Sequence, residues 1–194
     1  MIIGLTGGIG SGKTTILNFF EDLGAHTYSS DLRAKALMSE DDNLKEAIKN
    51  LFGDKAYLDS ELNRPYIAEI VFQDSSKLEA LNNLVHPAVH NDFKQFAARY
   101  PDAIVIYESA LLLSSKLRFW DYSLGIIVSP EQRLLRVMKR DGLTREQVES
   151  RMSKQLSNER VISMVDYLIY NDNLDQAKQE AKHLFTEWMS LLKN

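Results

Sequence analysis

The amino-acid sequence predicts a three-layer α/β fold around a parallel sheet of five strands. Short, continuous apolar runs recur along the chain, as is typical of strands that are covered on both faces. Helical patterns separate these runs, so successive strands are expected to be joined by crossover connections, which parallel strands require. A chain of 194 residues is long enough for one such core and a small insertion.

The first predicted strand, residues 2–6, runs directly into a glycine-rich loop. Residues 7–14 read Gly-Gly-Ile-Gly-Ser-Gly-Lys-Thr and match the pattern G-x-x-x-x-G-K-[ST] of a phosphate-binding loop. A helical pattern follows over residues 15–23, and Gly24 suits its end. Strand, loop and helix in this order are the context that the motif requires, so the fold is predicted to be P-loop NTPase-like.

The chemistry of this loop follows from its backbone. Successive N–H groups converge on an anion, and the start of the following helix adds the positive end of its dipole. Lys13 is expected to reach the β- and γ-phosphates of ATP, and the Thr14 hydroxyl is expected to bind Mg²⁺. The residues predicted to bind the nucleotide here are Gly8, Gly10, Ser11, Gly12, Lys13, Thr14 and Thr15. An ordinary glycine-rich turn is the alternative, which the flanking strand and helix disfavour.

Four further strands are predicted, over residues 26–30, 103–107, 124–128 and 167–170. Between the second and third of them, residues 44–100 lack a convincing strand, which predicts a helical insertion. Within it, Pro87 disfavours a helical conformation for the residue before it. From the residues alone, that residue, His86, is therefore expected to be a structural histidine.

The second half carries clear helix signals. Ser129, followed by a proline, predicts a capped helix that ends at about Asp141 before Gly142. Thr144 begins a second capping box. Residues 174–192 have the apolar spacing of a terminal amphipathic helix.

Polar residues stand just past several of the predicted strands, where ligands bind in parallel sheets. Asp31 is the best candidate for the base that deprotonates an acceptor, and a cap of the helical pattern over residues 32–37 is the equally weighted alternative. Glu108 is a candidate for holding magnesium through a water molecule, with a solvated loop carboxylate as its alternative. Asn171 follows the last strand.

A run of arginines and lysines predicts a lid over about residues 133–156. Gly142 separates its two helices, and a mobile helical pair of this kind can bring arginines onto phosphates. The run comprises Arg133, Arg136, Lys139, Arg140, Arg145 and Arg151. One or two of these cations are expected to contact phosphate, Arg140 first, and the others are expected at the surface. The alternative is a solvated helix face.

Composition limits the classes of function. The net charge of −4 argues against nucleic-acid binding over the whole surface, and no apolar stretch approaches the ~20 residues of a membrane span. No cysteine is present, which excludes disulfides. No signal peptide is recognised. We therefore expect a cytoplasmic protein, monomeric or weakly homo-oligomeric, that binds small molecules rather than nucleic acid or membranes.

Taken together, these motifs resemble the dephospho-coenzyme A kinase family over nearly the whole length. Residues 4–15 are similar to the opening of that family, and residues 138–144 resemble its lid motif. Further matches to the family pattern are Arg151 with Gln155, His86 with Pro87, and Asp166 with Asn171.

The resemblance implies an ATP- and Mg²⁺-dependent kinase that phosphorylates the ribose 3′-hydroxyl of dephospho-coenzyme A, the last step of coenzyme A synthesis. It implies catalytic roles for Asp31, Lys13 and Arg140, with Arg140 also binding ATP. It implies that the acceptor is bound by Asp31, Arg64, His86 and Glu108. Two positions depart from the family pattern, because Ser29 and Ser114 stand where acidic residues are usual.

Three alternatives stay open. A kinase of the same build could use another acceptor, such as a nucleoside monophosphate. A nucleotide-binding regulator without an acceptor is a second alternative, although the Asn-Lys-x-Asp motif of GTPase-type switches is absent from the sequence. A homologue that binds coenzyme A without catalysis is the third, suggested by Ser29 and Ser114.

Overall fold

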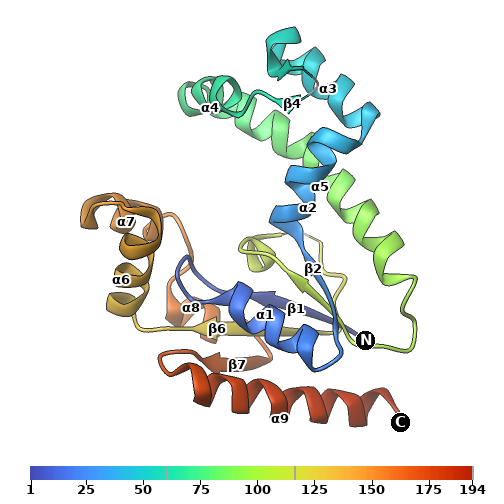
Figure 1. The fold of residues 1–194 in the computed structure, drawn as a ribbon, viewed down its shortest axis with the longest axis vertical. Helices are drawn as coiled ribbons and strands as arrows, with labels where there is room; N and C mark the ends of the chain where they lie inside the picture. The colour runs from blue at the N-terminus through green and yellow to red at the C-terminus, as the bar shows by residue number, and fades with distance from the viewer. Residues whose placement is uncertain (60, 116, 194) are drawn as a thin grey trace. The chain divides into compact units, whose positions relative to one another are not determined.

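The computed structural model describes residues 1–59, 61–115 and 117–193, and the chain divides into two compact units (Figure 1). The sheet unit comprises Met1–Ser29 and Tyr100–Asn194, and the helical unit comprises Ser30–Arg99. Within the described residues, no helix has both the length and the apolar character that crossing a bilayer demands.

The sheet unit is built on the predicted parallel sheet of five strands, which is confirmed. The strand order is β2-β5-β1-β6-β7, and every pairing is parallel. The strands are β1 (Ile2–Thr6), β2 (His26–Ser29), β5 (Val105–Glu108), β6 (Tyr122–Ile127) and β7 (Tyr167–Tyr170). The phosphate-binding motif follows β1, the central strand, so it lies at the middle of the carboxyl edge.

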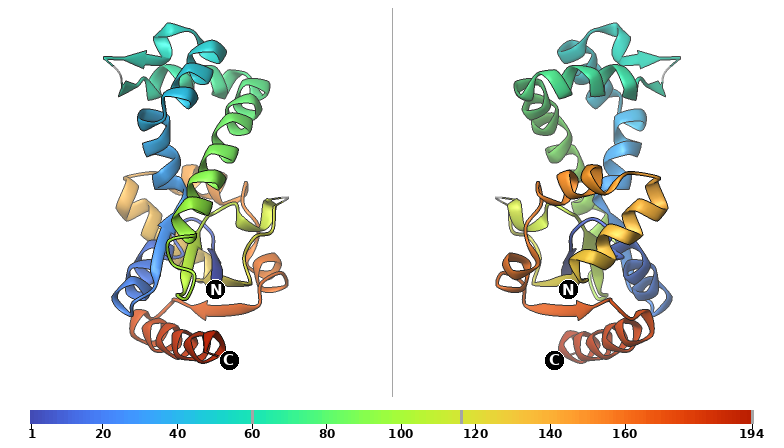
Figure 2. Two further views of the ribbon diagram at one scale, coloured as in Figure 1. Left: turned by 90° about the vertical axis from the view of Figure 1, so that its right-hand side faces the viewer. Right: turned by 90° about the vertical axis from the view of Figure 1, so that its left-hand side faces the viewer.

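Helices and loops cover both faces of this sheet. On one face, Ile3 and Leu5 of β1 pack in a core with helices α1 (Lys13–Asp22) and α9 (Leu174–Leu192), and Figure 2 shows α9 in red beside β7. On the other face, Gly4 is closely approached by Leu112 and Trp120. Because side chains alternate between the faces of a strand, these contacts define the three predicted layers.

Four short helices complete the sheet unit. They are η2 (Leu112–Ser114), α6 (Pro130–Asp141), α7 (Arg145–Met152) and α8 (Asn158–Ile162). The capping box at Thr144 is confirmed, since its side chain accepts from the Gln147 N–H and the Gln147 side chain accepts from the Thr144 N–H.

The predicted side-chain cap at Ser129 is wrong. Its hydroxyl donates to Asp172 Oδ1 over 2.6 Å, and its N–H donates to the same oxygen over 3.1 Å. Ser129 does stand at the N-cap position of α6, but its side chain makes no capping hydrogen bond. It instead joins the start of α6 to the segment that follows β7.

The helical unit begins at Ser30, earlier than the boundary near residue 44 expected from the sequence. Its first helix, α2, packs against α5, and Arg33 of α2 donates to both carboxylate oxygens of Asp92 over 2.9 and 3.0 Å. The elements are α2 (Ser30–Glu40), α3 (Asp42–Phe52), η1 (Asp54–Ala56), β3 (Tyr57–Leu58), β4 (Glu61–Leu62), α4 (Arg64–Gln73) and α5 (Ser75–Ala97).

The expectation that Pro87 keeps His86 out of a helix is also wrong. Both residues lie inside α5, a helix of 23 residues. Proline costs this helix one hydrogen bond. Val85, Val89 and Phe93 are buried along one side of α5, and the free energy gained from packing them offsets that loss.

Candidate active site

The phosphate loop turns sharply between β1 and α1. At Gly12, directly before α1, φ is 84°, a left-handed conformation that glycine adopts at little cost. A Cβ at this position would also collide with the side-chain amide of Asn171. The invariant last glycine of the motif pattern is therefore required here both by the backbone and by the space beside it.

Lys13 lies folded over the loop that precedes it. Its ammonium group donates to the Gly7 carbonyl over 2.9 Å and lies 4.0 Å from Glu108 Oε1. Both side chains are largely buried. The lysine of the motif and the carboxylate at the end of β5 thus lie together.

Glu108 is held from a second side by Ser29. The Ser29 hydroxyl donates to Glu108 Oε2 over 2.8 Å, and the two residues are register partners on neighbouring strands. Glu108 is only 5% exposed, so the alternative of a solvated loop carboxylate is excluded. A serine here donates a hydrogen bond to Glu108, whereas an aspartate at the same place would add a second negative charge.

Asn171 supports the loop from β7. Its side-chain Nδ2 donates to the Ser11 carbonyl over 2.8 Å, and its own carbonyl accepts from Arg136 Nη2 over 2.8 Å. Asn171 is 2% exposed. Its backbone N–H also bonds to Ile127 of β6, so the rigid sheet fixes the position of Ser11.

A second group of contacts supports the loop from α6 and the segment after α7. Arg133 Nε donates to the Ile9 carbonyl over 3.0 Å, and Gln155 Oε1 accepts from the Ile9 N–H over 2.7 Å. Arg133 also donates to Asn158 Oδ1 over 3.1 Å and to Gln155 Oε1 over 3.4 Å. Ile9 further packs beside Leu134, Val137 and Val148. The helical pair predicted as a lid is therefore joined to the phosphate loop.

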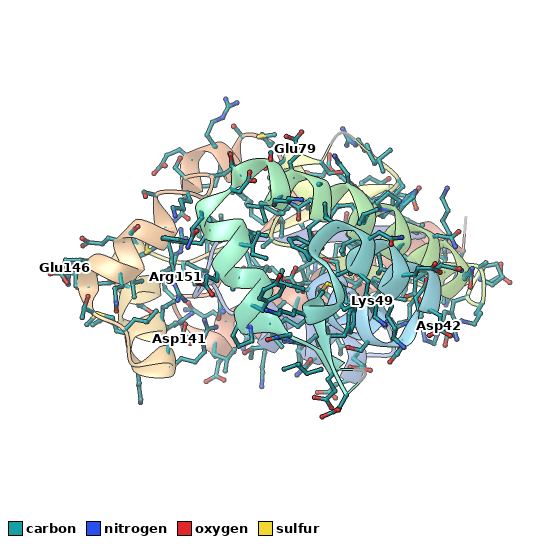
Figure 3. The ribbon with its side chains drawn as sticks, turned by 90° about the horizontal axis from the view of Figure 1, so that it is seen from above. Asp42, Lys49, Glu79, Asp141, Glu146 and Arg151 are labelled. Atoms are coloured by element: carbon teal, nitrogen blue, oxygen red, sulfur yellow. The ribbon has the colours of Figure 1, made fainter. Side chains whose placement is uncertain are left out.

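Arg140, the first candidate for a phosphate contact, points elsewhere in this structure. Its guanidinium donates to both carboxylate oxygens of Asp141 over 2.7 and 3.0 Å, and its side chain is 62% exposed. The hydrogen bond to Asp141 raises the pKa of Arg140 and lowers the pKa of Asp141. Arg151 approaches the same carboxylate over 3.5 Å; both Asp141 and Arg151 are labelled in Figure 3.

By contrast, Arg133 was expected at the surface and is 4% exposed. That expectation is wrong, and the sequence carried a signal that could have corrected it. Arg133 stands four residues before Val137, a buried residue of α6, and positions i and i+4 share one face of a helix.

The predicted acceptor-binding residues all belong to the helical unit, except Glu108. Asp31 lies in the first turn of α2, Arg64 begins α4 and His86 lies within α5; all three are exposed. Because α2 already begins at Ser30, Asp31 does not precede the helix, as the alternative of a cap expected. It is an acidic residue within the first turn, where a carboxylate is favourable, and its role as base stays a prediction.

The oxygen ligands suited to magnesium are few. Thr14 and Thr15 are exposed in the first turn of α1. Glu108 lies beside Lys13, the residue before Thr14. In the described ranges, no three His, Asp or Glu side chains are grouped as a metal site. A hydroxyl and a carboxylate nevertheless fit a hard cation that takes its remaining ligands from phosphate and water.

Comparison with known proteins adds the following findings. A model of the family described as "Dephospho-CoA kinase" matches residues 1–176. A dephospho-CoA kinase from Salinibacter ruber is 36% identical over 189 residues, which cover 94% of this chain and 95% of that protein. One from Fusobacterium nucleatum is 38% identical over 175 residues, covering 89% and 90% respectively. The crystal structure of TT1252 from Thermus thermophilus is similar with a TM-score of 0.84 and 30% identity, over 96% of this chain and 97% of that one.

Proposed function

Because the chain belongs to the dephospho-CoA kinase family, we propose that it transfers the γ-phosphoryl group of ATP to the ribose 3′-hydroxyl of dephospho-CoA. The products are CoA and ADP. The family match over residues 1–176 carries this proposal, since it spans the phosphate loop, the whole helical unit and the α6–α7 pair. A loop motif alone would support only nucleotide binding.

The donor side of the reaction rests on the phosphate loop. Its N–H groups and the start of α1 hold the phosphates of ATP, with contacts from Gly8, Gly10, Ser11, Gly12, Thr14 and Thr15. Lys13 leaves the Gly7 carbonyl, with which it pairs over 2.9 Å, and neutralises charge on the β- and γ-phosphates. Magnesium, when bound at Thr14 and through water at Glu108, neutralises further phosphate charge.

The acceptor side rests on the helical unit. Arg64 and His86 bind dephospho-CoA, and Asp31 accepts the proton of the ribose 3′-hydroxyl. The 3′-oxygen forms a bond to the γ-phosphorus, the bond from that phosphorus to the bridging β–γ oxygen breaks, and ADP leaves with the bond electrons. The protein positions the reactants and stabilises charge, which is most of what phosphoryl transfer requires.

Residues 133–156, which comprise most of α6, all of α7 and the segment after it, serve as the lid. On closure, the exposed Arg140 side chain exchanges its partner Asp141 for phosphate oxygens of ATP and stabilises the charge of the transferring group. Closure also excludes water, which would otherwise compete with the 3′-hydroxyl as acceptor. In keeping with its small-molecule substrates and lack of cysteine, the protein acts in the cytoplasm as a monomer or weak homo-oligomer.

The test is an ADP-release assay with ATP and a panel of acceptors, comprising dephospho-CoA and the nucleoside monophosphates. We expect ADP release that depends on dephospho-CoA and that the Lys13→Ala variant lacks. Turnover of a nucleoside monophosphate without a response to dephospho-CoA would contradict the proposed acceptor. Slow hydrolysis that no acceptor accelerates would contradict a kinase altogether.

A further inference from the structure

Arg133 is a buried cation whose hydrogen bonds all go to neutral oxygens. Its partners are the Ile9 carbonyl and the side-chain oxygens of Asn158 and Gln155. None of the ion pairs formed within residues 1–59, 61–115 and 117–193 involves Arg133. Burial lowers the pKa of Arg133 below its ordinary value, but a guanidinium remains charged at any physiological pH.

This arrangement is costly for a folded protein unless an anion compensates it. Buried charges are almost always paired, and in the α6–α7 pair even exposed arginines have carboxylate partners. Arg140 and Arg151 bond to Asp141, and Arg145 bonds to Glu131. Arg136 also has neutral partners, but it is only half-buried and so remains in contact with water.

The guanidinium of Arg133 lies directly against the phosphate loop. A Cβ at Gly8 would collide with the Nη2 and Nη1 atoms of Arg133. The guanidinium therefore occupies the space that a side chain at position 8 would need. The next residue of the loop, Ile9, is held through the two successive peptide groups on either side of its Cα: its carbonyl accepts from Arg133 Nε, and its N–H donates to Gln155.

We propose that Arg133 is a positioning residue that holds the phosphate loop through Ile9 and supplies a fixed buried positive charge which the bound phosphates of the nucleotide compensate. This inference rests on the proposed function and adds a second cation to Lys13. The two cations differ in their neighbours, because Lys13 already faces Glu108 over 4.0 Å whereas Arg133 faces no carboxylate among the described residues.

The decisive variant is Gln155→Glu. Gln155 Oε1 accepts both from the Ile9 N–H and from Arg133. A glutamate of the same shape retains both hydrogen bonds, replaces the amide NH2 by an oxygen and adds a negative charge beside the guanidinium. Gln147→Glu is the matched control. It adds the same charge on α7, at a capping-box position where glutamate serves as well as glutamine.

Two measurements separate the effect of the Arg133 charge on phosphate binding from its effect on the folded structure of the loop. The first is the Kd of ATP by calorimetry in EDTA, and the second is the rise in Tm produced by inorganic tripolyphosphate, which has no adenosine. For Gln155→Glu we expect a Tm without ligand at least equal to wild type, ATP affinity lower by roughly 10-fold and loss of most of the tripolyphosphate response. Gln147→Glu should match wild type in all three.

The outcomes distinguish this inference from the function on which it rests. A well-folded Gln155→Glu protein that binds ATP and tripolyphosphate like wild type would overturn the inference and leave the kinase proposal intact. A wild-type protein that responds to neither ligand would remove both. If Arg133→Lys keeps the tripolyphosphate response while Arg133→Gln loses it, the charge is supported independently of the hydrogen bonds that lysine cannot reproduce.

Discussion

At the scale of single residues, the site depends on side chains that hold other side chains. Lys13 contacts the loop carbonyl of Gly7, Glu108 lies beside Lys13, and Ser29 donates to Glu108. Because each of these side chains is held by the next, we expect single substitutions among them to change the stability of the site. Ser29, which departs from the family pattern, is one of them.

Changing Ser29 to alanine should destabilise the sheet unit. The substitution leaves a buried carboxylate with one donor fewer, and a hydrogen bond to a charged group contributes about 1.5–3 kcal/mol. Urea unfolding should show a decrease of this size in the free energy of unfolding, and Ser29→Thr, which keeps the hydroxyl, should lose much less. Equal stability of the alanine variant and wild type would show that the bond to Glu108 contributes nothing.

Changing Asp31 to asparagine should separate catalysis from nucleotide binding. Loss of the proposed base should lower kcat by roughly 10²-fold or more with little change in ATP affinity, because Asp31 does not belong to the phosphate loop. Steady-state kinetics and ATP titration measure the two effects. Asp42→Asn is the control, since Asp42 also lies in the first turn of its helix and is labelled in Figure 3. Unchanged turnover of Asp31→Asn would leave Asp31 with only its role at the helix start.

At the scale of elements, one carboxylate joins two neighbouring strands. Asp166 Oδ2 accepts from the Ser123 hydroxyl over 2.6 Å and from the Ser123 N–H over 2.8 Å, which ties the start of β6 to the residue before β7. These hydrogen bonds, the one from the Ser123 side chain foremost, lower the pKa of Asp166.

The lowered pKa of Asp166 predicts a particular dependence of stability on pH. Because the folded-state pKa lies below the ordinary value of 3.8, Asp166 stabilises the fold above that pH, and this contribution is lost as the pH falls through the folded-state pKa. Asp166→Asn should therefore have a lower Tm than wild type at pH 7, with a difference that shrinks below about pH 4. Thermal scans across pH, with the exposed turn residue Asp102→Asn as control, measure this. A difference that stays constant across pH would contradict it.

The elements also show what the sequence could predict and why. All five strands of the sheet and helices α6, α7 and α9 were predictable, because apolar runs and capping signals are local. The conformation of His86, the partner of Ser129 and the burial of Arg133 were not predicted. The first two depend on distant groups, namely the buried side of α5 and Asp172. The third had a local signal in the position of Val137, but a run of charged residues more often marks a solvated helix face.

The candidate site was predictable to a similar extent. The motif predicted the loop and Lys13, and a rule about strand ends singled out Glu108, because both signals are local or topological. The contacts of Gln155 and Asn171 with the loop span 146 and 160 residues of sequence. No spacing rule predicts which backbone atom such a residue reaches.

At the scale of the whole molecule, the candidate site residues are distributed over two compact units. The sheet unit contains the phosphate loop, Glu108 and the α6–α7 pair, and the helical unit contains Asp31, Arg64 and His86. The helical unit includes α2, which directly follows β2, whereas the sequence predicts an insertion from about residue 44 because a helix after a strand is typical of an ordinary crossover. On the proposed function, ATP is a ligand of one unit and dephospho-CoA chiefly a ligand of the other.

The most direct test of this account is an end-point reaction of the purified protein with ATP, magnesium and dephospho-CoA, analysed by mass spectrometry. The account predicts that dephospho-CoA gains one phosphate at the ribose 3′ position, that one ADP forms for each CoA, and that Lys13→Ala forms neither. Dephospho-CoA of unchanged mass after complete incubation with a folded protein would contradict it.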